Sequence, residues 1–185
     1  TRSGARPGDD IWVSGCVGGA WAALMHRWGK LTLDARVFPA AALAMDRPNP
    51  RNALGTALLS SATACADISD GLAQDLGHIL ERSGVDADVL WDAVPKHPAL
   101  AALSQEQQVE AAMSGGDDYE LVFTAPADKR GLIEQASISA LTPVTRIGRI
   151  VEKKPSGAPL AIRDASGRPL FLPVQGFDHF AQSAD

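Results

Sequence analysis

Two short acidic segments contain the residues of this chain whose types and spacing could do chemistry. The first is Asp67-Ile68-Ser69-Asp70-Gly71 and the second is Gly115-Gly116-Asp117-Asp118-Tyr119-Glu120-Leu121. Each places carboxylates in a turn between a helix and a strand, next to glycines that let the backbone approach a ligand closely. Carboxylate oxygens are the ligands that magnesium prefers, and magnesium commonly holds phosphate groups as well. Both segments therefore predict a site for magnesium and phosphate.

The first acidic segment places two carboxylates on one tight turn. Asp67 ends a predicted buried strand and Asp70 begins a predicted helix three residues later, so both side chains can point to the same side. Helix capping is the alternative explanation, and Ser69 is expected to be the N-cap of this helix. Capping leaves the carboxylate at the strand end unexplained. Because two carboxylates at a helix N-terminus repel phosphate unless a divalent cation lies between them, the segment favours metal and phosphate binding.

The second acidic segment lies where a helix passes into a strand. Strand alternation sends Asp117 and Tyr119 to one side of the chain and Asp118 and Glu120 to the other, so only one pair needs to face a ligand. A carboxylate here could hold a metal or accept hydrogen bonds from an amine of a ligand. A solvated acidic turn explains the same residues, and the segment alone leaves these alternatives open.

The composition describes a globular chain with one core. The sequence has 185 residues, 45% of them hydrophobic, which is enough to bury the core of a single domain over residues 1–185. The net charge is −5 and the longest basic run is Lys153-Lys154, so no nucleic-acid partner is expected. No apolar run approaches the roughly 20 residues of a membrane span, so no membrane partner is expected either.

The cysteines and histidines argue against two further kinds of site. Cys16 and Cys65 are too few for a disulfide framework, and their apolar neighbours predict buried thiols in a reducing, cytoplasmic compartment. The four histidines show no metal-binding spacing with one another or with cysteine, so a zinc site is not expected. The chain begins with Thr1 and not with methionine, and we expect it to start inside a longer polypeptide.

Helices and strands alternate along the chain. The clearest helix covers residues 70–82, and its apolar face consists of Leu72, Leu76, Ile79 and Leu80. Further helices are predicted after residue 19 up to about 28, within 31–50, and at 51–61, 104–114 and 126–137, the fourth of these beginning with a capping box at Ser104. Strands are predicted at 10–14, 63–66, 85–90, 119–124, 144–151 and 160–163, and a turn at 164–169 leads into a returning strand at 170–174. These elements predict an α+β fold, with a mixed β-sheet and helices packed on its faces.

Arginines and glycines near the start of the chain have two interpretations each. Arg2 and Arg6 could reach a polyphosphate, although a flexible solvated terminus is favoured without further information. Gly18 and Gly19 could contact phosphate, but their spacing fits neither standard nucleotide-binding fingerprint. Tight packing of a helix on the sheet is therefore the favoured role for these glycines.

Five segments taken together resemble the thiamine-monophosphate kinase family. They are residues 1–9, 67–72, 75–79, 114–121 and 176–180, and they span essentially the whole chain. Looser forms of the first two occur in aminoimidazole ribonucleotide synthetase and in the hydrogenase maturation dehydratase, whereas the closing Gly-Phe-Asp-His-Phe segment favours the kinase. The resemblance implies the C-terminal domain of this superfamily. The family's N-terminal domain, with its glycine-rich ATP segment, most of its magnesium ligands and its dimer interface, would lie outside this chain.

The resemblance also implies roles for single residues. Arg2 and Ser69 would contact ATP, and Asp67 and Asp70 would bind magnesium. Asp117 and Phe177 would contact the thiamine moiety, since a carboxylate suits an aminopyrimidine edge and an aromatic face suits a flat cationic ring. The family usually has Glu where this chain has Asp117. The acidic role implied for this position is the same, but the shorter Asp side chain leaves the exact contact with the substrate open.

The implied reaction moves the terminal phosphoryl group of ATP to the phosphate of thiamine monophosphate and gives thiamine diphosphate, with Mg²⁺ as cofactor. No residue is assigned as a general base, because the attacking phosphate oxygen is already anionic. A cytoplasmic homodimer is implied for the full-length protein, and this chain alone is expected to fold but to show little or no kinase activity. The alternatives are another ATP-using member of the superfamily and a non-catalytic ligand-binding domain.

Overall fold

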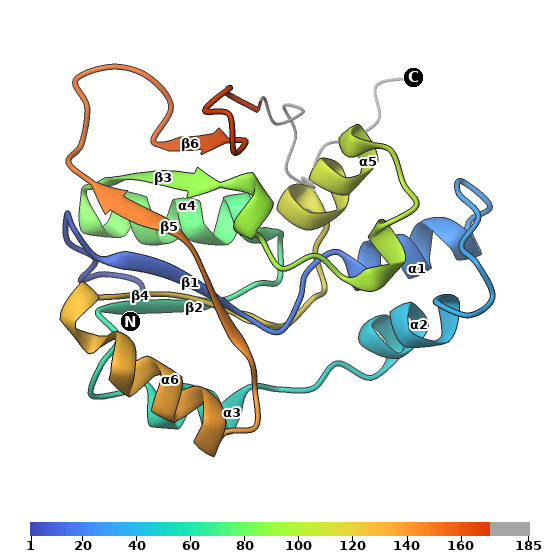
Figure 1. Cartoon of the computed structure of the whole chain (residues 1–185), viewed down its shortest axis with the longest axis horizontal. Coiled ribbons are helices and arrows are strands. Elements are labelled where there is room, and N and C mark those ends of the chain that lie inside the picture. Colours follow the sequence, from blue (N-terminus) through green and yellow to red (C-terminus); the bar gives the residue numbers. More distant parts are fainter. Residues whose placement is uncertain (171–185) are drawn as a thin grey trace, which may run out of the picture.

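A mixed six-stranded sheet forms the centre of the molecule. The computed structural model describes residues 1–170 (Figure 1). The strands are β1 (Asp10–Ser14), β2 (Ala64–Asp67), β3 (Asp86–Leu90), β4 (Leu121–Ala125), β5 (Val144–Val151) and β6 (Leu160–Arg163). Their order is β2-β4-β1-β5-β3-β6, and only the β3–β6 pair of this sheet is parallel. The predicted mixed sheet with packed helices is confirmed.

Six α-helices accompany the sheet. They are α1 (Gly19–Arg27), α2 (Phe38–Asp46), α3 (Asn52–Ala57), α4 (Leu72–Ser83), α5 (Gln105–Val109) and α6 (Arg130–Ser139). Single helical turns cover Trp91–Ala93, Pro98–Leu100 and Ala127–Lys129, and a π-helical turn at Glu110–Ser114 continues α5. Among these helices, none is long and apolar enough to cross a membrane over residues 1–170.

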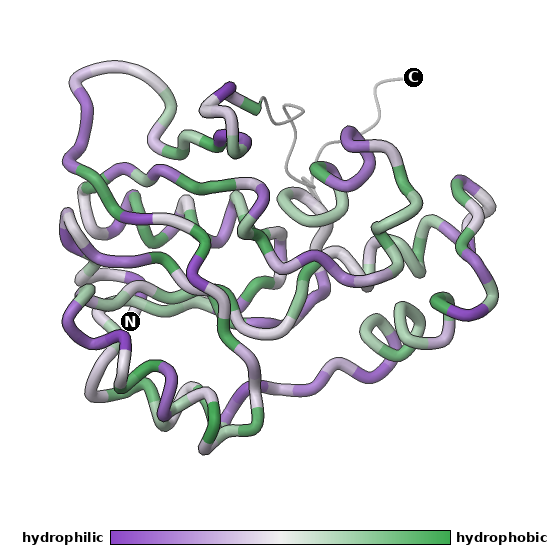
Figure 2. Tube along the Cα trace, in the orientation of Figure 1, coloured by the Kyte–Doolittle hydropathy of each residue, from purple (hydrophilic) through white to green (hydrophobic). Residues whose placement is uncertain are grey.

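The two faces of the sheet have different cores. Ile11 and Val13 of β1 belong to a large core cluster that includes α4, whereas Trp12 belongs to a smaller cluster that includes α3 and α6. Helices α3 and α6 lie together below the strands in Figure 1. Trp12 stacks there on Phe123 of the neighbouring strand, with ring centroids 6.3 Å apart. Hydrophobic residues recur along all the strands (Figure 2). Strand β1 is therefore covered on both faces and lies inside the sheet, between β4 and β5.

Helix α4 has the predicted apolar face but begins later than expected. Leu72, Leu76, Ile79 and Leu80 are all buried, and Gly84 ends the helix with a left-handed φ of 68°. Ser69 is not its N-cap: Gly71 takes that position with φ 109° and ψ 147°, and no side chain caps the helix. This prediction was wrong because the glycine keeps the chain extended beyond Ser69.

The remaining boundaries agree with the pattern except at two points. The capping box at Ser104 and Gln107 is present in both directions. Strand β4 starts at Leu121 and not at Tyr119, because Tyr119 has a left-handed φ of 52° that a strand does not accommodate. Helix α3 is shorter than predicted and ends at Ala57.

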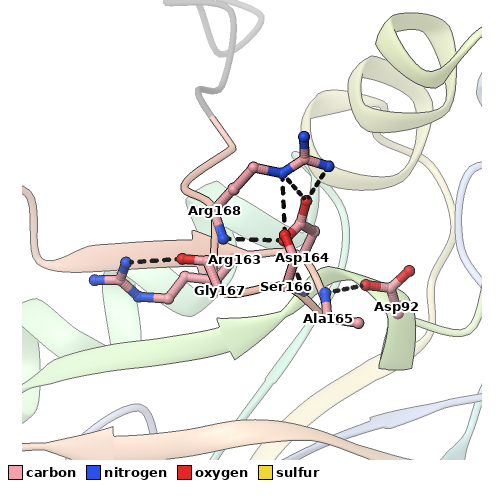
Figure 3. A network of polar contacts seen from close by, with 7 residues as sticks. All are labelled: Asp92, Arg163, Asp164, Ala165, Ser166, Gly167 and Arg168. Carbon is pink, nitrogen blue, oxygen red and sulfur yellow. Dashed lines mark hydrogen bonds and ion pairs between the residues drawn. The ribbon is translucent and has the colours of Figure 1, made fainter.

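The predicted turn after β6 is closed by its own polar groups (Figure 3). The Gly167 N–H donates to the Asp164 carbonyl at 2.9 Å, and the Leu170 N–H donates to Ile162 at 2.9 Å. The Asp164 carboxylate accepts hydrogen bonds from Ser166 and Arg168, which draw the turn together (Figure 3). The rest of the expected returning strand, 171–174, lies outside the described residues.

Candidate functional site

The two acidic segments lie side by side. We call residues 67–71 the first acidic loop and residues 115–121 the second acidic loop. The Asp117 N–H donates to the Ser69 carbonyl at 2.9 Å, the Tyr119 N–H donates to the Ile68 carbonyl at 2.9 Å, and the Ile68 N–H donates to the Glu120 carbonyl at 2.7 Å. The loops therefore form one unit, although 48 residues of chain separate their first members, 67 and 115.

Sheet topology explains this pairing. Strand β2 runs into the first acidic loop, and the second acidic loop runs into β4. These strands are antiparallel neighbours with Asp67 opposite Leu121, so both loops emerge at the same end of the sheet. The pairing brings the first and second acidic loops, with Asp67, Ser69 and Asp117, to the same end of the sheet.

Glycine makes the close approach of the loops possible. A Cβ atom at Gly116 would lie 2.4 Å from the Ser69 carbonyl oxygen, and one at Gly71 would lie 2.9 Å from the Met113 carbonyl oxygen. Gly71 also needs its positive φ of 109°. These two glycines thus allow the close contact between the backbone segments of the two loops.

Left-handed residues set the directions of the side chains in the second acidic loop. Asp117 has φ 65° and Tyr119 has φ 52°, which is uncommon for residues other than glycine. Both side chains are exposed, and the Tyr119 hydroxyl donates to Asp117 Oδ1 at 3.3 Å. Asp118 and Glu120 turn inward. The predicted division into two pairs is correct, but backbone conformation causes it and not strand alternation.

Glu120 belongs to a buried ion pair and not to the exposed surface. Arg51 Nε donates to Glu120 Oε2 at 2.7 Å and Arg51 Nη2 donates to Oε1 at 2.5 Å, so the contact is bidentate. The Ser14 hydroxyl donates to the same carboxylate at 2.5 Å and accepts the Leu121 N–H at 2.8 Å. No local pattern marks Arg51 or Ser14 as partners, because they lie 69 and 106 residues away in the sequence.

Asp118 ties the second acidic loop to the start of α1. Its two carboxylate oxygens accept the Gly18 N–H at 2.8 and 3.0 Å. Burial raises the pKa of Asp118 to about 7, against the hydrogen bonds from Gly18 and Ala20, and the charges of Glu120 and Asp117 raise it further. Gly18 has φ 87°, and a Cβ atom there would lie 2.7 Å from Leu100 Cδ1 and 3.2 Å from the Ala111 carbonyl carbon, so the close packing is against helical turns and not against the sheet as predicted.

The N-terminal segment is held beside β2 and places Arg2 at the first acidic loop. The Cys65 N–H donates to the Thr1 carbonyl at 2.9 Å, and the N–H groups of Gly4 and Ala5 both donate to Ser83 Oγ at 3.2 Å. Arg2 Nη2 then lies 4.0 Å from Asp67 Oδ1, with both side chains about half exposed. The segment is solvent-exposed over residues 1–4, as the favoured alternative has it, but its backbone is bonded to β2 and to Ser83.

Carboxylates from both loops influence the Tyr119 side chain through their charge. The pKa of Tyr119 is raised first by the charge of Asp117, then by burial and the hydrogen bond to Asp117, and further by the charges of Asp67 and Asp70. Three anions therefore act on one phenol. A surface of this charge repels free phosphate and attracts a divalent cation, for which carboxylate oxygens are suitable ligands.

Asp75 supports the first acidic loop from α4 and was missed in the sequence. It is 1% exposed, and its Oδ2 accepts the N–H groups of Ser69 at 2.9 Å and Asp70 at 3.0 Å. The available signal was its position on the apolar face, three residues after Leu72. Asp70, Asp75 and His78 offer ligand atoms within 4.8 Å of one another, so they could hold a metal ion. Asp67, predicted as a ligand together with Asp70, is outside this group of three.

Two other predictions have different outcomes. Phe177 lies outside residues 1–170, so its predicted contact with thiamine stays a prediction. Cys16 and Cys65 are both free, and they are partly buried instead of fully buried. Burial raises the pKa of each thiol to about 11, which makes both poor nucleophiles at neutral pH.

Comparison with known proteins gives one family and a consistent set of relatives. The family model described as AIR synthase related protein, C-terminal domain, matches residues 6–159. The thiamine-monophosphate kinase of Salmonella typhimurium is 40% identical over 97% of this chain and 55% of its own length, and that of Escherichia coli K12 is 39% identical over 98% and 55%. The chain thus spans about half the length of the curated relatives it matches.

Solved structures show the same similarity. The thiamine-monophosphate kinase of Stenotrophomonas maltophilia superimposes with a TM-score of 0.79 and 41% identity, over 87% of this chain and 52% of that one. A structure described as AaThiL complexed with AMPPCP and TMP has a TM-score of 0.75 and 29% identity, over 97% and 53%. The hydrogenase maturation protein HypE of E. coli, at 18% identity and a TM-score of 0.62, shares the fold.

Proposed function

The chain belongs to the AIR synthase related proteins through their C-terminal domain, and on this premise we propose that it is the C-terminal part of a thiamine-monophosphate kinase. The complete protein would transfer the terminal phosphoryl group of ATP to the phosphate of thiamine monophosphate. The similarity to curated kinases over nearly the whole chain supports this proposal. One structural observation carries it: backbone hydrogen bonds join the two acidic loops, so Ser69 and Asp117, the residues assigned to ATP and to thiamine, are neighbours.

The residues present suit magnesium. Asp67 and Asp70 would hold the ion, and their oxygen donors lie in a loop whose anions outnumber Arg2, the cation paired with Asp67. Bound magnesium would neutralise charge on the phosphate groups. Arg2, half exposed at the loop, would contact a phosphate of ATP, and Ser69 would donate its hydroxyl to ATP.

Binding of thiamine monophosphate, the phosphate acceptor, would depend on the second acidic loop. Asp117 is exposed and would accept hydrogen bonds from the aminopyrimidine, while Phe177 would cover the cationic ring. Positioning and charge neutralisation are sufficient for this transfer, since the attacking oxygen already carries negative charge. A cytoplasmic location and a homodimer of the complete protein are part of the same proposal.

The test is a coupled assay on the complete protein for ATP-dependent formation of thiamine diphosphate, with magnesium and with a chelator. Turnover that stops with chelator supports the proposal, and the 185-residue chain alone should show little or none. The single variants Asp67→Asn and Asp70→Asn should each raise the magnesium concentration needed for half-maximal rate about tenfold, because each loses one charge-assisted contact with the ion. Asp128→Asn, an exposed carboxylate outside both loops, is the matched control and should change nothing.

Three results would overturn the proposal. Magnesium-independent turnover would remove the metal role of the first acidic loop. Turnover of a different phosphate acceptor but not of thiamine monophosphate would favour another ATP-using enzyme of the superfamily, and Asp117 would lose its assigned role. Ligand binding without any turnover by the complete protein would favour a non-catalytic domain.

A further inference from the structure

Asp75 is a carboxylate where the pattern of α4 calls for an apolar side chain. It follows Leu72 by three residues and precedes Leu76, and all three side chains are 0–1% exposed. An apolar residue at this position would continue the buried face. Carboxylates are almost never fully buried unless they are paired, so the presence of Asp75 needs an explanation other than packing.

The hydrogen bonds of Asp75 give that explanation. Its Oδ2 accepts two successive backbone N–H groups, from Ser69 at 2.9 Å and from Asp70 at 3.0 Å. Two N–H groups that converge on one oxygen fix the orientation of both peptide planes. Since the side chains of Ser69 and Asp70 leave from these same residues, their directions are fixed as well.

On the side that faces α4, the first acidic loop is supported by Asp75. The N-cap residue Gly71 has no side chain, and no side chain of the described residues caps α4. On the other side of the loop, the Ser69 carbonyl accepts the Asp117 N–H from the second acidic loop. Ser69 is therefore held through its carbonyl by one loop and through its N–H by Asp75.

The second oxygen of Asp75 takes no part in these hydrogen bonds. Oδ1 is buried and has no hydrogen-bond partner within residues 1–170. The Asp75 carboxylate lies with Asp70 and His78 in the group whose ligand atoms are within 4.8 Å of one another. The Asp75 carboxylate thus lies close to Asp70, a predicted metal ligand.

Resting on the proposed function, we propose that Asp75 is a positioning residue: by accepting the N–H groups of Ser69 and Asp70, it holds the first acidic loop in the conformation that binds ATP and its metal. Asp75 itself is buried and does not touch the substrate. Its loss should therefore weaken binding at the ATP end more than at the thiamine end, because Asp118 and Glu120 still hold the second acidic loop.

Three variants of the complete protein separate positioning from stability. Asp75→Ala removes the acceptor, whereas Asp75→Asn keeps one carbonyl oxygen that can accept both N–H groups. Asp86→Ala is the matched control: Asp86 is 3% exposed and accepts one backbone N–H, that of Lys154 at 2.9 Å, on a strand that is not next to either loop. Both alanine variants should lower the thermal midpoint of unfolding.

Kinetics and hydrogen exchange give the two readouts. Asp75→Ala should raise the KM for ATP by about tenfold and leave the KM for thiamine monophosphate within about twofold, because hydrogen bonds to a charged group are lost at the ATP end alone. Asp75→Asn should restore most of the ATP affinity, and Asp86→Ala should leave both KM values unchanged. By NMR, the Ser69 and Asp70 amides should exchange faster in Asp75→Ala than in Asp86→Ala.

The exchange experiment keeps this inference separate from the proposed function. If the wild-type protein shows no kinase activity, the proposed function fails, while amide exchange still tests the support by Asp75. Unchanged exchange at Ser69 and Asp70 in Asp75→Ala would overturn the inference. It would also be overturned if Asp75→Asn were as impaired as Asp75→Ala, because charge and not hydrogen-bond acceptance would then be what the site requires.

Discussion

Replacing Arg51 with methionine should destabilise the domain through the carboxylate it leaves behind. The side chains of Arg51 and Glu120 are 19% and 7% exposed, and they share a bidentate contact. Removing one partner of a buried ion pair costs about 3–5 kcal/mol, because the remaining charge is uncompensated. Ser14 continues to donate its hydroxyl to Glu120, which places the expected loss at the lower end, about 3 kcal/mol.

Equilibrium unfolding of the 185-residue chain in urea measures this loss. With a slope of about 2 kcal/mol per M, the midpoint should fall by roughly 1.5 M. Arg36→Met is the control, since Arg36 pairs with Asp34 at the surface and its side chain is 89% exposed, so no measurable change is expected. Adding Glu120→Gln to Arg51→Met should recover part of the stability, because the neutral amide still accepts the Ser14 hydroxyl. A loss below about 1 kcal/mol would show that the carboxylate reaches water, and the reasoning would be refuted.

Two further predictions concern the pairing of the two acidic loops and Asp10, the first residue of β1. Gly116→Ala places a methyl group 2.4 Å from the Ser69 carbonyl oxygen, so it should raise the KM values for both ATP and thiamine monophosphate in the complete protein; unchanged kinetics would mean that the loops separate without consequence. Asp10 is buried against Arg130, and although burial raises its pKa, hydrogen bonds and charges from two arginines lower it overall. The Asp10 carboxylate thus contributes fully to the free energy of unfolding above its unfolded-state pKa of about 3.9. This contribution is lost as the pH falls through the lower folded-state pKa of Asp10. The stability of the wild type over Asp10→Asn should be larger at pH 7 than at pH 2, and a gap independent of pH would contradict this sign.

Local sequence patterns predicted helices and strands well where the residues of the element itself, such as an apolar face or a cap, determine its position. The apolar face of α4 and the capping box at Ser104 are both present in the structure. The start of α4 was misplaced because the extended conformation of Gly71 and the hydrogen bonds to Asp75 override the capping preference of Ser69. Side-chain partners five or more residues away are not visible in a local pattern.

The site was predictable in its residue types but not in its supports. Both acidic loops were identified by their carboxylates, and their pairing follows from the neighbouring positions of β2 and β4. Arg51 could not be assigned to Glu120, because 69 residues separate them and only the fold brings them together. Of the four acidic and aromatic side chains at 117–120, two support the loop from inside, and nothing in the sequence distinguished the backbone conformations that turn them inward.

The backbone hydrogen bonds between the two acidic loops leave the side chain at one position free to change. At residue 117 the backbone N–H makes the bond to Ser69, while the side chain faces solvent and takes no part in that bond. A substitution of this side chain can therefore change the proposed contact with the acceptor without removing the backbone hydrogen bond between the loops. Asp117 has a left-handed φ of 65°, a conformation in which Asp is several-fold enriched, so Asp suits the backbone of the loop at this position.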